Sequence, residues 1–296
     1  MEKEVLENFQ IPESAFVTVT TTKHITEIQY LQKKNTEMPI LKLDSDTYVV
    51  KATGEIKEFV HSESRADDLK SVRSTLKKLR YLINNNFDGS DNELFVTLTY
   101  KENMRDTVKL MKDFEKFIKR LKYRYKSYDF DYLSVVEPQE RGSFHFHVLF
   151  RFNGLKTIFI ANNEIADIWG HGFVNVRRIQ QVDNIGAYLS AYLADLTVDI
   201  DEDIEGAVVK NMLDVKTNKT VSKKVLKGAR MYLYPSSMNI YRKSKGIKMP
   251  ERRILPYRAI KKERLGEKTF QNSFEISDKE TAFTNIIGYE YYNSNR

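Results

Sequence analysis

The 296-residue chain has no cysteine, only 12 glycines and 6 prolines, and no long apolar run. Without cysteine it cannot carry a disulfide scaffold, a thiolate zinc site or a cysteine nucleophile, which fits a reducing cytoplasm. The first residues lack a basic-then-apolar leader pattern and no stretch reaches membrane-spanning length, so we expect a cytoplasmic protein without a membrane partner. A P-loop, a glycine-rich dinucleotide turn and a Gly-x-Ser-x-Gly motif are also absent. The sequence therefore gives no sign of nucleotide-cofactor or serine-hydrolase chemistry.

The charge of the chain is positive and unevenly distributed. A net charge of +7 suggests an acidic partner such as nucleic acid. Residues 223–264 contain fourteen Lys and Arg against two acids, whereas residues 195–205 are acidic. Within the basic region, residues 228–246 mix aromatic and basic side chains. This mixture fits contacts to a DNA backbone with base stacking, and it fits equally an edge strand with one solvated face.

The segment 141–151, Arg-Gly-Ser-Phe-His-Phe-His-Val-Leu-Phe-Arg, alternates as a β-strand does. One face is predicted to be buried and apolar; it carries Phe144, Phe146, Val148 and Phe150. The opposite face carries Ser143, His145, His147 and Leu149. Two of the five histidines of the chain therefore share one strand face, where their imidazoles could hold one metal ion.

Two imidazoles leave a metal site incomplete, so the pattern predicts a nearby oxygen ligand. Glu137 ends a predicted strand, and residues 138–142 read as a hairpin connection that folds it back alongside His145. This makes Glu137 the preferred third ligand. Glu140 and Gln139, both in the connection, are the alternatives.

Tyr188 and Tyr192 lie four residues apart in the predicted helix 183–196 and therefore share a helical face. An ordinary core stripe explains the same spacing; it would comprise Ile185, Leu189, Tyr192 and Leu196. A metal site nearby favours a second interpretation. A tyrosine hydroxyl has an ordinary pKa of about 10 and is a poor nucleophile unaided, but a divalent cation can polarise a phosphodiester for attack. Attack would leave a covalent phosphotyrosine, which a second tyrosine could resolve.

The predicted elements between residues 94 and 196 follow the order β-α-β-β-α-β-α. This is the order of an α+β, ferredoxin-like (RRM-like) sandwich with an antiparallel central sheet. The elements are the strand 94–100, a helix from Asp106 to about Lys122, the strand 132–137, the histidine strand, the helix 162–169, the strand 172–178 and the helix 183–196. The first helix should bury an apolar stripe, namely Val108, Met111, Phe114, Ile118 and Leu121. His171, between two glycines, is predicted to be a turn residue and not a ligand.

Four segments are predicted along the chain. They are a β-rich extension with a helix at residues 1–90, the metal-binding core at 91–196, an acidic, polar loop or insertion at 197–221, and a basic C-terminal segment at 222–296. The extension should contain strands at 15–22, 25–31, 47–52 and 55–60 and a helix at 64–85.

Three blocks, in this order, resemble the three motifs of the HUH endonucleases: Phe95-Val-Thr-Leu-Thr-Tyr100, His145-Phe-His147, and the helix with Tyr188 and Tyr192. In particular, the chain resembles the rolling-circle replication initiators (Rep proteins) of bacterial plasmids, phages and integrative elements. This branch includes the microvirus and filamentous-phage replication proteins. By motif the resemblance covers residues 94–196. Two flanking segments, 64–87 and 234–242, are also similar to Gram-positive members.

The resemblance implies that residues 91–196 are an HUH endonuclease core that nicks single-stranded or hairpin origin DNA in the bacterial cytoplasm. It implies that His145, His147 and an acidic residue hold Mg²⁺ or Mn²⁺, and that Tyr188 and Tyr192 are catalytic. The enzyme would stay joined to the 5′ phosphate through tyrosine and leave a 3′ hydroxyl for a DNA polymerase. Because no helicase motif is present, unwinding would depend on a host helicase.

One departure from the family pattern concerns the nucleophile. Two-tyrosine members usually carry lysine where this chain has Ala191 and Asp195, so the sequence leaves open which tyrosine attacks first. A relaxase or a single-strand transposase would share the chemistry and act on a different DNA substrate. A non-catalytic DNA-binding module and a metal hydrolase that uses water are further alternatives, and neither would form a covalent protein–DNA adduct.

Overall fold

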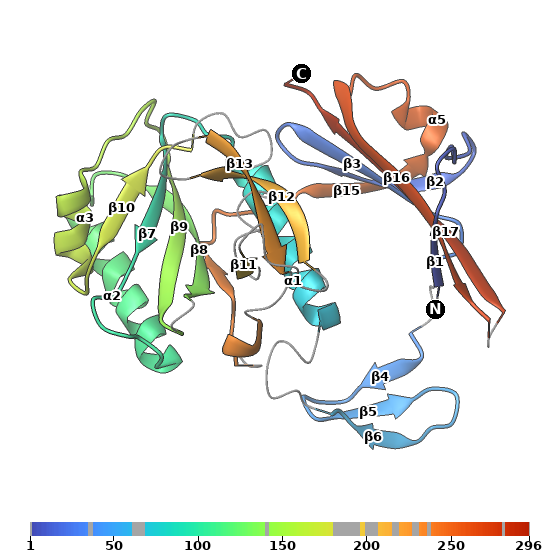
Figure 1. Cartoon of the computed structure of the whole chain (residues 1–296), viewed down its shortest axis with the longest axis horizontal. Helices are drawn as coiled ribbons and strands as arrows, with labels where there is room; N and C mark the ends of the chain where they lie inside the picture. The colour runs from blue at the N-terminus through green and yellow to red at the C-terminus, as the bar shows by residue number, and fades with distance from the viewer. Residues whose placement is uncertain are drawn as a thin grey trace. The chain divides into compact units, whose positions relative to one another are not determined.

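The computed structural model describes residues 2–34, 38–60, 69–139, 142–179, 196–198, 207–214, 219–226, 231–235, 238–279 and 282–295. It has the α+β composition that the sequence predicts, with antiparallel sheets and few helices (Figure 1). The chain forms two compact units. Unit 1 comprises Met1–Ser62 and Glu251–Arg296, and unit 2 comprises Glu63–Pro250. In the described part of the chain, no helix combines the length and apolar character needed to cross a membrane.

Unit 1 is built on a six-stranded antiparallel sheet in the order β1-β16-β17-β3-β2-β15. Its strands are β1 (Glu2–Val5), β2 (Phe16–Thr21), β3 (Ile25–Leu31), β15 (Glu251–Pro256), β16 (Glu267–Asp278) and β17 (Phe283–Asn293). The short helix α5 (Tyr257–Ile260) follows β15, and its Ile260 packs with Val17, Val19 and Ile28 in a small core. A separate three-stranded sheet comprises β4 (Ile40–Lys42), β5 (Thr47–Val50) and β6 (Ile56–Glu58).

The N-terminal strands lie where the sequence predicts them, but their partners come from the other end of the chain. Strand β17 pairs with β3, and the Gln29 amide donates to the Tyr289 hydroxyl oxygen at 2.9 Å across 260 residues of sequence. Both ends of the chain therefore share one sheet. The predicted boundaries at residues 90 and 222 do not coincide with the two units, because this long-range pairing leaves no mark in local composition.

The central sheet of unit 2 has five antiparallel strands in the order β10-β7-β9-β8-β14. The elements of this part are α1 (Leu69–Asn86), β7 (Glu93–Leu98), α2 (Thr107–Arg124), β8 (Phe130–Pro138), β9 (Phe144–Phe152), α3 (Asn162–Trp169), β10 (Val174–Arg177), the 3₁₀ turn η2 (Met231–Leu233) and β14 (Tyr241–Lys243). The predicted strands and helices up to β10 are present, with ends that differ by a few residues. In the basic region, Tyr241–Lys243 forms an edge strand on β8, which was one of its two interpretations.

Helices α2 and α3 cover the aromatic face of the sheet. Phe146 of β9 stacks on Phe114 of α2 with 4.5 Å between ring centroids, and Trp169 of α3 contacts both Phe117 and Phe146 edge-on. Helix α2 begins as predicted, since the Asp106 carboxylate caps it by accepting two backbone N–H bonds. The predicted stripe was wrong at Val108, which is 63% exposed. The helix turns a different side to the sheet and buries Leu110, Phe114, Phe117, Ile118 and Leu121.

The opposite face of β9 carries His145, His147, Leu149 and Arg151. The Arg151 guanidinium donates to the backbone carbonyl of Asn86, the last residue of α1, at 2.9 Å and pairs with the Asp131 carboxylate of β8 at 3.0 Å. The C-terminal end of α1 is thereby tied to this face. The two histidines lie farther along the same face, toward the β8–β9 hairpin.

Residues 196–226 contain strands that the sequence did not predict. Strands β11 (Leu196–Val198), β12 (Ala207–Asp214) and β13 (Lys219–Leu226) form an antiparallel sheet in the order β11-β13-β12. The loop predicted for 197–221 is therefore wrong for these described residues, because the neighbouring acidic run masked two strand-like segments. Leu196 lies in a strand, so the predicted helix 183–196 does not extend to it. Tyr188 and Tyr192 lie outside the described residues.

Gly172, in the turn between α3 and β10, packs against the end of β7. It has a φ of 154°, and an added Cβ would lie 2.5 Å from the Lys101 nitrogen and 2.6 Å from the Thr99 oxygen. We expect Gly172→Ala to lower the free energy of unfolding by about 1–3 kcal/mol, measured by urea denaturation, because backbone must move to admit the methyl group. Gly154→Ala is the control: φ is also positive, at 77°, but no heavy atom lies within 4 Å of the added carbon. A larger loss at Gly154 would contradict this account.

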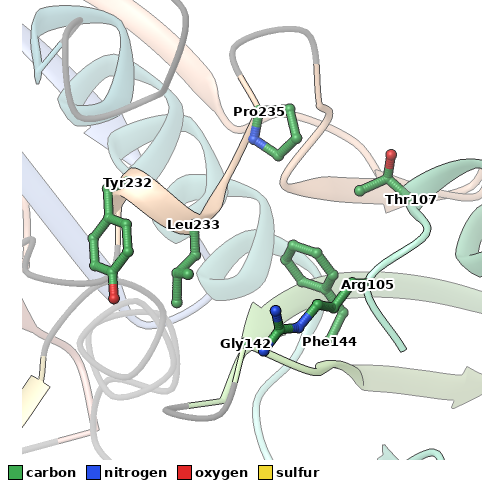
Figure 2. A pocket seen from close by; sticks show the side chains of 7 residues that line it. All are labelled: Arg105, Thr107, Gly142, Phe144, Tyr232, Leu233 and Pro235. Carbon is green, nitrogen blue, oxygen red and sulfur yellow. The ribbon is translucent and has the colours of Figure 1, made fainter. Parts of the chain in front are cut away.

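A cavity of about 390 Å³ lies beside the end of the β8–β9 hairpin in unit 2. It is lined by Arg105, Thr107, Gly142, Phe144, Tyr232, Leu233 and Pro235 (Figure 2). Because Phe144 and His145 are neighbours on one strand, their side chains point to opposite faces, and the cavity lies on the aromatic side.

Candidate metal centre

Glu137, His145 and His147 converge above one face of the unit 2 sheet. Glu137 of β8 is the direct antiparallel partner of His145 of β9, and His147 lies two residues farther along the same strand. Directly opposed residues on neighbouring strands hold their Cβ atoms about 4.5–5.5 Å apart, so three side chains of this length can meet. The hairpin pairing that the sequence predicts for Glu137 is what brings them together.

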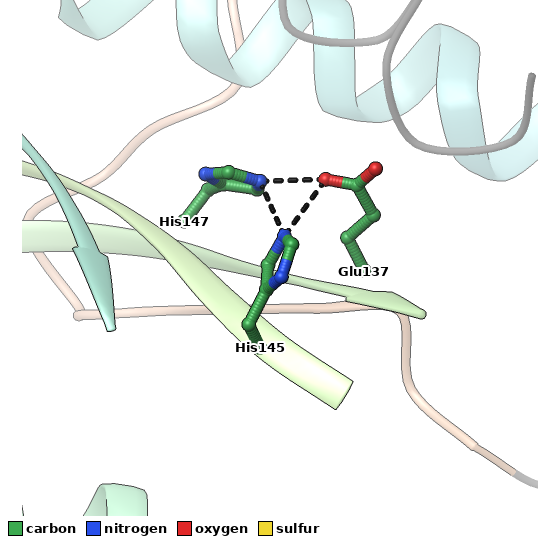
Figure 3. Close-up of side chains that lie close together, drawn as sticks. All are labelled: Glu137, His145 and His147. Carbon is green, nitrogen blue, oxygen red and sulfur yellow. Dashed lines mark hydrogen bonds and ion pairs between the residues drawn. The ribbon is translucent and has the colours of Figure 1, made fainter. Parts of the chain in front are cut away.

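The three groups meet through one atom each (Figure 3). The Oε2 atom of Glu137 lies 3.0 Å from Nε2 of His145 and 2.6 Å from Nε2 of His147, and the two Nε2 atoms are 2.9 Å apart. A carboxylate oxygen and two imidazole nitrogens in such a triangle could hold one metal ion. The remaining coordination positions would stay open to substrate oxygens.

The cluster is largely shielded from water but reachable from one side. The side chain of Glu137 is 8% exposed, whereas that of His147 is 19% exposed. Burial would raise the pKa of the Glu137 carboxyl, but hydrogen bonds from both histidine rings and their charge hold that pKa well below its usual range. Glu137 is therefore a carboxylate at neutral pH and supplies negative charge to a cation.

Strand β7 holds His147 in place from its other side. Thr97 is the strand partner of His147, and the Thr97 hydroxyl and the Nδ1 atom of His147 are 3.2 Å apart in a hydrogen bond. The Phe95 ring lies parallel to the imidazole, with 5.4 Å between centroids and 8° between planes. With Nε2 as the ligand atom, Nδ1 carries the proton and donates to the Thr97 oxygen. Thr97 therefore fixes both the ring orientation and the tautomer.

We expect Thr97→Val to weaken Mn²⁺ binding about 10- to 100-fold, because Val keeps the shape but removes the acceptor that orients His147. Thr97→Ser retains the hydroxyl and should bind Mn²⁺ nearly as the unaltered protein does. Calorimetric titration of both variants measures the difference. Equal affinity in the valine variant would show that Thr97 does not position the ring.

Comparison with known proteins bears on the same part of the chain. Residues 93–197 match the model of a family described as replication-associated protein, of the ORF2 type. This match supports a role in replication initiation and is compatible with nuclease activity. The matched segment contains Glu137, His145 and His147, and also Tyr188 and Tyr192. No curated protein and no solved structure matches the chain.

The other residues considered as ligands lie elsewhere in the segment that matches this family. The backbone N–H of Gln139 donates to Ser143 and its carbonyl accepts from Gly142, which makes it part of the hairpin turn. Glu140 lies outside the described residues. His171 lies in the turn after α3, as predicted, with its ring 4.9 Å from that of Trp169 and its Nε2 atom 3.8 Å from the Asp113 carboxylate.

Thr97 is the residue that sequence reasoning overlooked. It lies within the Phe95–Tyr100 block, whose alternation places Phe95 and Thr97 on one face. The sequence does not reveal that this strand pairs with β9 in the register that sets Thr97 opposite His147. The signal was a polar residue in an otherwise apolar strand.

Proposed function

We propose that this protein is an HUH-type nickase that initiates rolling-circle replication by cutting single-stranded origin DNA and forming a 5′-phosphotyrosine intermediate. The observation that carries the proposal is the Glu137–His145–His147 triangle, which lies inside the segment that matches the replication-associated family. A replication role requires a protein that handles DNA, and a metal site of this type suits cleavage of phosphodiesters.

The strand topology supports an HUH domain of ferredoxin-like fold. The chain order β7-α2-β8-β9-α3-β10 combines with the sheet order β10-β7-β9-β8. Two split β-α-β units therefore interleave, each with one strand inserted between its own two, and both helices pack on the aromatic face. The opposite face is left for the metal cluster.

The donor set fits Mg²⁺ or Mn²⁺, held by Glu137, His145 and His147. Two ligand atoms at a right angle on a cation with bonds of about 2.1 Å lie about 3.0 Å apart, whereas tetrahedral ligands lie about 3.4 Å apart. The separations of 3.0 and 2.9 Å agree with the octahedral value. The third, 2.6 Å between Glu137 and His147, is shorter than either. Two of the three separations thus favour Mg²⁺ or Mn²⁺ over zinc.

In the proposed reaction the hydroxyl oxygen of Tyr188 or Tyr192 bonds to the scissile phosphorus. The bond from phosphorus to the 3′ oxygen breaks, and the tyrosine proton ends on the released 3′ hydroxyl. A bound cation would stabilise the negative charge that develops on the phosphate oxygens. One phosphodiester replaces another, so the second tyrosine or the 3′ hydroxyl can rejoin the ends without ATP.

Charge supports unit 2 as the part that binds DNA. It carries 32 Lys and Arg against 24 Asp and Glu, a net charge of +8, whereas unit 1 carries 16 against 17. Excess positive charge attracts the phosphate backbone. We propose single-stranded or hairpin origin DNA as the substrate, with a host helicase and DNA polymerase acting on the nicked product.

A cleavage assay tests the proposal. Full-length protein is incubated with Mn²⁺ and single-stranded or duplex DNA from the origin of its own genetic element, and the products are resolved on denaturing gels. We expect one cut in the single strand, none in the linear duplex, and no cut with EDTA. Tight binding to the single strand without any cleavage would instead support a non-catalytic DNA-binding module.

A further inference from the structure

The cavity beside the β8–β9 hairpin has the chemistry of a nucleotide-binding pocket. Of the seven described residues that line it, only Arg105 is charged. Its side chain points into the cavity, toward the side on which Tyr232 and Leu233 lie (Figure 2). Phe144, Leu233 and Pro235 supply apolar surface, and Thr107 supplies a hydroxyl. A cationic donor beside aromatic and apolar walls suits a group with a flat base and an anionic phosphate.

The wall formed by η2 is anchored to the sheet. Tyr234, directly after η2, is fully buried, and its hydroxyl donates to the Val136 carbonyl of β8 at 2.8 Å. Its ring lies 6.1 Å from that of Phe144. Tyr232, two residues earlier, keeps 64% of its surface exposed. A fixed backbone thus presents an accessible aromatic ring at the mouth of the cavity.

The other wall joins the cavity to the strand that carries the histidines. The backbone N–H of Met104 donates to the hydroxyl of the buried Ser143 at 3.0 Å, and the backbone N–H of Phe144 donates to the Met104 carbonyl at 2.8 Å. These bonds hold the Arg105 segment against the first residues of β9. Since His145 follows Phe144 directly, the cavity and the metal cluster flank the same end of one strand.

We propose that this cavity binds one unstacked nucleotide of the single-stranded DNA, next to the nicked phosphodiester, with Tyr232 stacking on the base and Arg105 contacting a phosphate. The volume of about 390 Å³ lies within the range of about 300–1,000 Å³ that small-molecule sites span. The positive charge of unit 2 favours a polyanionic occupant. The position of the nucleotide beside the nick rests on the proposed function; the binding of a single strand does not.

Binding is measured by fluorescence anisotropy with full-length protein and a labelled oligodeoxythymidylate, in EDTA and at one salt concentration. We expect Tyr232→Ala and Arg105→Ala each to weaken binding about tenfold, and Tyr232→Phe to bind as the unaltered protein does. Tyr123→Ala is the matched control, because Tyr123 lies on α2 and is 82% exposed. Thermal melting confirms that each variant is folded.

An abasic scan separates base stacking from a backbone contact. Oligonucleotides with one abasic position, moved along the strand, are bound to the unaltered protein and to Tyr232→Ala. At one position the abasic lesion should weaken only the unaltered protein, since the variant has no ring to stack. Binding within about twofold in both alanine variants, or the absence of such a position, would overturn the proposal. These readouts do not need cleavage, so a protein that fails to nick can still support the cavity, and one that nicks can contradict it.

Discussion

Replacing His147 with alanine is expected to slow metal-dependent cleavage on the order of 10³-fold, because several kcal/mol of charge stabilisation at the phosphate are lost with the cation. The variant keeps Glu137 and His145, which provide two donor atoms instead of three. Two donors hold a divalent cation weakly, so part of the activity should return at high Mn²⁺ concentration. Cleavage rates over a Mn²⁺ titration measure both effects.

Two further variants make this prediction specific. Glu137→Gln keeps the size of the side chain but removes its charge, and it should reduce cleavage as His147→Ala does. His171→Ala removes an imidazole from the same unit but outside the cluster, where the ring contacts Trp169, and it should cleave normally. Full cleavage by His147→Ala at low Mn²⁺ would show that the cluster is structural.

Removing both hydroxyls, with Tyr188→Phe and Tyr192→Phe combined, is expected to abolish the covalent adduct, a loss of at least about thousandfold. Phenylalanine preserves the ring and leaves no oxygen to bond to phosphorus. The two single variants then identify the first nucleophile, which Ala191 and Asp195 leave open. The variant that loses the adduct on a fresh origin strand carries the first attacking tyrosine.

A matched control for the tyrosines is Tyr123→Phe. It removes one exposed tyrosine hydroxyl from α2 in the same unit and should leave adduct formation unchanged. Cleavage that persists in the double variant would assign the attack to water or to another tyrosine. Loss of cleavage in Tyr123→Phe would instead point to a general effect on DNA binding.

The metal cluster was predictable because its signals are local. Alternating Phe and His over β9 fix which side chains share a face, and a connection of a few residues fixes the pairing of Glu137 with His145. The strand and helix order from β7 to β10 follows from similar short-range patterns. In α2, helical spacing alone did not determine which side faces the sheet, so Val108 was misplaced.

The features that sequence reasoning overlooked depend on contacts between distant segments. Thr97 reaches His147 only through the β7–β9 register, 50 residues apart in sequence. The sheet of unit 1 joins β3 to β17 from opposite ends of the chain. The cavity combines side chains near residues 105, 143 and 233, none of which signals a pocket in its own segment. Composition and periodicity do not encode such juxtapositions.

The most direct test of the account is the transfer of labelled DNA to the protein. Full-length protein is incubated with Mn²⁺ and 3′-labelled single-stranded origin DNA, then heated in detergent and resolved on a denaturing gel. We predict a labelled band that migrates with the protein, is absent when EDTA is added beforehand, and is lost in the double tyrosine variant. Efficient cleavage with no label on the protein would contradict the proposed tyrosine transfer and identify a metal hydrolase that uses water.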